Sequence, residues 1–153
     1  MMAGVGLEVF RLHSYEEFQV WLARNEDVRE ELEDLIGVDL GVDEHSLDTL
    51  EAFLLGRYRT PEEALRLDER NVLDGAARHI GLVFVLNVDG AEWGINLDDP
   101  DRAYWALPIV RFADGDEACP YALAFTALDR RTGDFLREVL EAYEEQYNTA
   151  TPG

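Results

Sequence analysis

The residues best suited to acid–base or metal chemistry are three histidines, His13, His45 and His79. No two of them lie four residues apart, so the helical spacing of zinc proteases is absent. His45 stands among carboxylates, but the glycine and the closing glutamate of a calcium loop are missing. His79 falls in the middle of a predicted helix, and no neighbour in the sequence is marked to orient it as a base. These patterns predict neither a metal site nor a catalytic histidine.

The candidate nucleophiles are equally isolated. The two serines, Ser14 and Ser46, occupy positions typical of helix N-caps and not of a Gly-x-Ser-x-Gly turn. Cys119 precedes a proline, and the sequence marks no base or orienting group for it. The chain has no lysine, no Gly-x-Gly-x-x-Gly and no phosphate-binding loop. The sequence therefore predicts a protein that has no cofactor and is not an enzyme.

Cysteine usage and the N-terminus bear on the compartment. A single cysteine excludes an intrachain disulfide, which is typical of a reducing environment. Residues 1–12 have no basic segment followed by an apolar one, so no secretory signal is predicted. Uncharged runs such as 118–128 are too short to span a bilayer. We expect a cytoplasmic protein that does not insert into a membrane.

Charge is the strongest signal in the composition. The 153 residues carry 13 basic and 33 acidic side chains, a formal charge of −20, and every basic residue is an arginine. This balance disfavours direct binding to nucleic acid, whose affinity depends on cationic contacts to phosphates, and binding to anionic membranes. It favours solubility and, through electrostatic steering, a basic protein partner.

The carboxylates are densest between residues 26 and 48, where ten of them accompany a single arginine, Arg29. A run of like charge is often only a solvated helix face, and that interpretation stays open. The alternative is a docking surface for the basic partner. The predicted surface residues are Glu26, Asp27, Glu30, Glu31, Glu33, Asp34, Asp39, Asp43 and Glu44.

The elements that carry these residues follow from capping signals and periodicity. Ser14 begins a short helix, and the apolar spacing within 26–36 predicts an amphipathic helix whose other face is almost entirely carboxylate. Residues 37–43 form a loop. The other helix starts in this acidic helical part, about 14–66, are Asp43 or Ser46, and Thr60.

The second part, about 68–147, combines helices with a small sheet. Its short apolar runs over 82–88 and 120–128 suit a helix or a strand, and a proline at the start of the second run favours a helix. The predicted helices are 69–86, 120–128 and 133–147, begun by Asp68, Pro120 and Thr132.

Two strands are expected, over 92–97 and 103–112, and Pro108 confines the second to a sheet edge or a bulge. Tyr104 and Trp105 would then face opposite sides of an edge strand. One of the two would be exposed and suited to an interface.

Together these elements predict an α+β fold in one domain over residues 1–153. N-terminal helices precede a small antiparallel sheet of two or three strands, and a C-terminal amphipathic helix packs against the sheet. The ends of the chain, 1–4 and 148–153, are expected to be flexible.

Short motifs within residues 68–147 follow a suggestive order before the terminal amphipathic helix. They are Arg78-His79-Ile80-Gly81, Gly90-Ala91-Glu92-Trp93, Leu107-Pro108 and Cys119-Pro120. In this order the segment resembles small bacterial α+β domains found among the immunity proteins of toxin systems. The resemblance covers about half of the chain. It implies a non-enzymatic protein that binds a cognate partner, often a toxin, and it assigns no functional residue.

The sequence thus favours a strongly acidic binding protein that captures or neutralises a basic protein partner, in the manner of an immunity protein or an inhibitor. Mimicry of nucleic-acid charge and an adaptor role are versions of this hypothesis. One alternative is a small enzyme with His79 or His45 beside a carboxylate in a cleft. Another is a structural subunit whose edge strand, containing Trp105, pairs with a neighbour.

Overall fold

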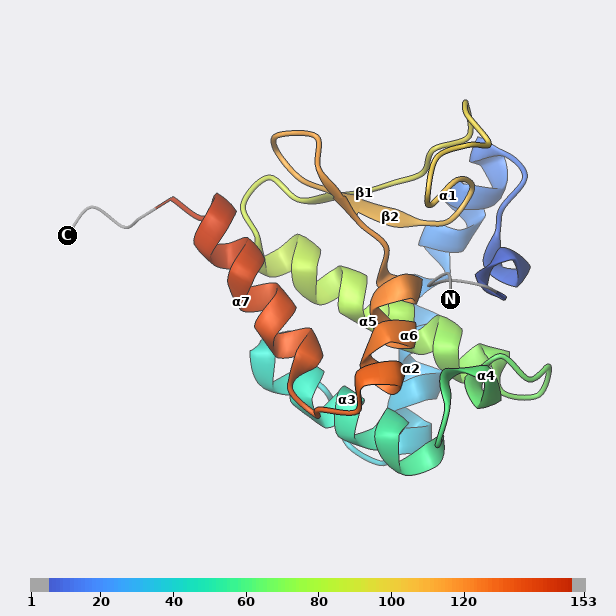
Figure 1. The fold of residues 1–153 in the computed structure, drawn as a ribbon, viewed down its shortest axis with the longest axis vertical. Helices are drawn as coiled ribbons and strands as arrows, with labels where there is room; N and C mark the ends of the chain where they lie inside the picture. Colours follow the sequence, from blue (N-terminus) through green and yellow to red (C-terminus); the bar gives the residue numbers. More distant parts are fainter. Residues whose placement is uncertain (1–5, 150–153) are drawn as a thin grey trace.

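The computed structural model describes residues 6–149, and Figure 1 shows one small sheet lying at one side of the group of helices. The fold is α+β, with N-terminal helices and a C-terminal helix, as the sequence predicts. The predictions for residues 1–4 and 150–153 lie outside the described residues. In chain order the elements are η1 (Leu7–Phe10), α1 (Tyr15–Ala23), α2 (Asn25–Ile36), α3 (Glu44–Arg57), α4 (Pro61–Ala64), α5 (Arg70–Asn87), β1 (Glu92–Gly94), β2 (Ile109–Arg111), β3 (Glu117–Ala118), α6 (Pro120–Arg130) and α7 (Phe135–Tyr147).

Local capping determines where the N-terminal helices begin and end. The Ser14 hydroxyl accepts the Glu17 N–H at 3.1 Å at the start of α1. At α3 the cap is Asp43, whose carboxylate accepts the Ser46 N–H at 3.1 Å. Gly37 ends α2 with φ 91°, a left-handed conformation that favours glycine. Residues 82–88 and 120–128, which were ambiguous in the sequence, are helical up to Asn87 and throughout the second run.

Two predicted N-caps are wrong. Asp68 does not cap α5, which begins at Arg70 without a side-chain cap. Thr132 does not cap α7, because that helix begins at Phe135 and a distant carboxylate accepts its first N–H groups. In both cases the helix begins two or three residues after the predicted cap.

The sheet has the order β1-β2-β3, with antiparallel pairing of both neighbours. The second predicted strand was wrong in extent and position. Only Ile109–Arg111 is a strand, and it lies at the centre of the sheet and not at an edge. The preceding residues form turns, in which Trp105 N–H donates to Arg102 O at 3.1 Å and Ala106 adopts φ 65°. Pro108 precedes the ladder, so its missing N–H removes no hydrogen bond from the sheet.

Helix α5 lies at the centre of the molecule, packed against α2, α6 and the sheet (Figure 1). The sheet approaches it at Gly81, where a Cβ atom would lie 1.9 Å from Cη2 of Trp93. A side chain at this position would push the sheet away from the helix. One cluster of buried apolar residues joins the helices to the sheet, and Leu73, Ile80, Phe84, Ile109 and Leu128 are among its fully buried members.

Candidate functional site

Helix α2 presents the densest group of exposed carboxylates. Its apolar residues Val28 and Leu32 are 8% and 3% exposed and face the core, and the positions on the opposite side of the helix face solvent. Five of these carry exposed carboxylates, and none of the five takes part in a hydrogen bond or ion pair within residues 6–149. They are Glu26, Asp27, Glu30, Glu31 and Asp34.

Arg29, the one arginine within α2, turns toward the interior. Its Nε–H donates to Nδ1 of His79 at 3.2 Å. The guanidinium makes no ion pair with a carboxylate of α2 within the described part of the chain. The outward face of α2 therefore keeps its negative charge.

The other predicted acidic residues fall into two groups. Glu33 and Asp43 serve the local fold. Glu33 Oε2 accepts the Leu40 N–H at 2.7 Å and holds the loop after α2, and Asp43 caps α3. Asp39 and Glu44 are exposed, and their side chains make no hydrogen bond within residues 6–149. The structure thus brings the five α2 carboxylates together and commits two of the predicted nine elsewhere.

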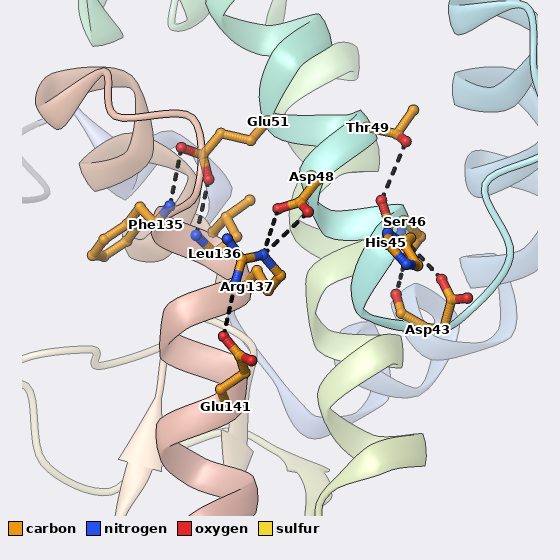
Figure 2. Close-up of polar contacts among 10 residues, drawn as sticks. All are labelled: Asp43, His45, Ser46, Asp48, Thr49, Glu51, Phe135, Leu136, Arg137 and Glu141. Atoms are coloured by element: carbon orange, nitrogen blue, oxygen red, sulfur yellow. Dashed lines mark hydrogen bonds and ion pairs between the residues drawn. The ribbon is translucent and has the colours of Figure 1, made fainter.

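The carboxylates of α3 behave differently, as Figure 2 shows. Glu51 is fully buried and accepts the N–H groups of Phe135 at 3.2 Å and Leu136 at 2.9 Å, at the start of α7. Asp48 pairs with Arg137 at 3.1 Å. A carboxylate at a helix N-terminus satisfies orphan N–H groups and opposes the positive end of the helix dipole. These side chains join α3 to α7.

Tyr104 and Trp105, the predicted interface aromatics, are both half-buried and lie in the turns before β2. The guanidinium of Arg11 stacks on the Trp105 ring at 5.2 Å from its centroid. The prediction that they occupy an edge strand is wrong, because both lie in turns outside β2, which is itself paired on both sides. Trp105 therefore does not lie on an edge strand that could pair with a neighbouring molecule.

His79 is fully buried, and within residues 6–149 its ring makes no hydrogen bond or ion pair with a carboxylate. Arg29 donates to Nδ1, so Nε2 carries the proton and donates to the Ser46 hydroxyl at 2.9 Å. That hydroxyl in turn donates to Asp43 O at 2.6 Å. Burial, with the nearby Arg29 cation, lowers the pKa of His79 to about 3. In a serine nucleophile the hydroxyl would donate to the imidazole, so this arrangement has the opposite polarity to a catalytic pair.

A second buried polar cluster joins α1, α5 and α6, and the sequence analysis missed it. Arg78 is 5% exposed, pairs with Asp74 at 3.0 Å and lies 4.1 Å above the Trp21 ring. The Tyr121 hydroxyl donates to Asp74 and accepts from Trp21 Nε1 at 3.0 Å. Burial first, and then Asp74, raises the pKa of Tyr121. The only sequence signal was an Asp and an Arg four residues apart on a predicted helix.

An apolar groove of about 210 Å³ borders the acidic face of α2. It lies between α2 and the first turn of α5, and Val28, Leu32, Leu35 and Val72 line it together with Glu31 and Asn71. Leu35 is 47% exposed at its margin. The α2 surface therefore combines unpaired charge with an accessible apolar contact.

The chain matches no family model, no curated protein and no solved structure. Among residues 6–149, no three His, Cys, Asp or Glu side chains gather in a geometry suited to a metal ion. Over the same range, no helix combines the length and apolar character needed to cross a bilayer.

Proposed function

We propose that this protein is a non-enzymatic binding protein that captures or neutralises a basic protein partner through the outward face of α2. The observation that carries the proposal is the group of five exposed carboxylates without a cationic partner among the described residues. Like charges three or four residues apart destabilise a helix, so these side chains oppose the stability of α2 beyond its first turn. A binding partner that brings cationic side chains would give these carboxylates a favourable interaction.

The charge of the whole chain supports the same proposal. With a formal charge of −20, the protein attracts a basic surface over a distance comparable to the Debye length, about 8 Å at physiological salt. Such attraction speeds encounter and suppresses acidic competitors. An immunity-like or inhibitor-like protein that covers the basic surface of a toxin, or of a nucleic-acid-binding protein, would act in this way.

The proposal is tested by affinity capture from the lysate of the native host with three versions of the protein. They are the wild type, the α2 variant E26Q/D27N/E30Q/E31Q/D34N, and a control variant E92Q/D98N/D101N/E138Q/E145Q with the same net charge. Wild type and control are expected to retain one or a few basic proteins, identified by mass spectrometry, and the α2 variant is expected to lose them.

Raising salt from about 50 mM to about 500 mM should release the partner, because screening weakens contacts between exposed charges. Equal retention by all three proteins, or retention that salt does not change, would show that the α2 carboxylates do not carry binding.

A further inference from the structure

The groove between α2 and α5 has a preformed apolar floor. Val28 and Leu32 are almost fully buried there, and a Cβ atom on Gly75 would lie only 3.2 Å from Leu32 Cβ. This close approach of α5 to α2 holds the floor in place without a bound partner. Leu35, 47% exposed, leaves apolar surface at the margin. The volume of about 210 Å³ is enough for one large apolar side chain.

The rim of the groove is negative along α2. Glu31 lines the groove itself, and Asp27 and Asp34 flank Glu31 at four and three residues along the same side of the helix. A rise of 1.5 Å per residue separates these three carboxylates by about 6 Å and about 4.5 Å along the axis. Side chains on one face of any α-helix have the same spacing.

We propose that the partner presents a basic amphipathic helix to this surface. One of its apolar side chains enters the groove, and its arginines or lysines, three or four residues to either side, face Asp27, Glu31 and Asp34. Charge complementarity selects this occupant, since an apolar groove with a negative rim matches an apolar stripe with positive flanks. An extended basic segment would meet the same carboxylates, but its side chains alternate between two faces and recur on one face at about 6.6 Å. This inference rests on the proposed function and names its partner more closely.

Two synthetic peptides of identical composition test the inference. One places leucines on one face of a helix with lysines on both flanks, and the other scrambles the order so that no amphipathic face forms. Fluorescence anisotropy of labelled peptides gives their Kd values for the wild type, for Leu35→Gln and for the matched exposed control Leu86→Gln. Leu86 is 58% exposed and lies near the opposite end of α5.

The helical peptide is expected to bind the wild type about tenfold more tightly than the scrambled one, a ratio typical of burying one leucine. Leu35→Gln should abolish the difference and Leu86→Gln should preserve it. In NMR spectra of the labelled protein, the helical peptide should shift the amide signals of residues 28–35 and of Asn71 and Val72. Far-UV circular dichroism checks that both variants are folded.

The outcomes separate the inference from the proposed function. If the two peptides bind equally and Leu35→Gln has no effect, the groove does not select a helix, although charge-led capture stands. The α2 variant E26Q/D27N/E30Q/E31Q/D34N is measured with the same two peptides. If it binds both as tightly as the wild type, the proposed function itself fails. If the protein alone self-associates in sedimentation and Leu35→Gln dissociates it, a second copy occupies the groove and the inference is overturned.

Discussion

Helices α2 and α3 follow each other in the chain, and both are acidic, but they use their carboxylates in opposite ways. On α3 and at its cap, Asp43, Asp48 and Glu51 accept hydrogen bonds from the protein, two of them from residues of α7 (Figure 2). On α2, five exposed carboxylates find no such donor within residues 6–149. Acidic residues are denser on α2, but the sequence does not show which carboxylates of either helix have partners in the fold.

The partners of a charged side chain, and not the number of charges nearby, indicate its role. A carboxylate that satisfies buried N–H groups contributes to folding, since those groups would otherwise be left without water or a partner. A carboxylate that is exposed among like charges contributes little or nothing to the fold. The proposed function therefore rests on α2 and not on α3.

Substitution of Glu51 should have the largest effect on stability. Glu51→Ala removes the acceptor of two N–H groups at the start of α7 and leaves a buried gap, so we expect the free energy of unfolding to fall by about 2–4 kcal/mol. Denaturant unfolding, followed by circular dichroism, measures this change.

Glu51→Gln is the matched control, because its amide oxygen still accepts one N–H. Its free energy of unfolding should fall by less than that of the alanine variant. If Glu51→Ala unfolds at the denaturant concentration of the wild type, the contrast between α3 and α2 is broken.

Acid should weaken the junction of α2, α3 and α5 at His79. Its pKa is about 3 in the folded protein against an ordinary value of 6.5, so the unfolded chain binds a proton that the native protein does not. The stabilisation is complete above pH 6.5 and decreases by about 1.4 kcal/mol per pH unit as the pH falls toward 3. Between pH 8 and pH 5 the loss should reach about 2 kcal/mol.

Unfolding measured across this range should show the slope in the wild type and not in His79→Gln, whose amide keeps a donor and an acceptor without titrating. The His79 ring signals should also stay constant in NMR spectra from pH 8 to pH 5. A titration of that ring within this range would place a charge where the structure has a neutral imidazole.

Neutralising α2 should have the smallest effect on stability, and the opposite sign. The variant E26Q/D27N/E30Q/E31Q/D34N removes like-charge pairs three and four residues apart, each worth about 0.2–0.5 kcal/mol. Loss of the favourable acids in the first turn, Glu26 and Asp27, offsets part of this gain. We expect the free energy of unfolding to rise by about 1 kcal/mol or less. A fall of about 2 kcal/mol or more would assign these carboxylates to the fold and remove the basis of the proposed function.

Local interactions made most elements predictable from the sequence. Ser14, Asp43 and Gly37 determine helix ends through contacts or backbone conformations within a few residues, and Pro120 begins α6 as expected. The strand predicted over 103–112 was too long, because apolar residues packed in the turns before Ile109–Arg111 imitate strand alternation. On the candidate surface, the sequence located α2 and its charge, but it did not separate the free carboxylates from Glu33 and Asp43.

The α+β class, most helix limits and the excess of negative charge could thus be predicted from the amino-acid sequence. Three features depend on contacts between distant segments and became visible only in the folded protein. Glu51 caps a helix 84 residues later, His79 contacts Ser46 and Arg29, and β2 lies at the centre of the sheet. Capping and periodicity act over a few residues, so they are visible in a single stretch of chain. The partner of a buried polar group depends on which distant segments the core brings together, and no local pattern encodes that meeting.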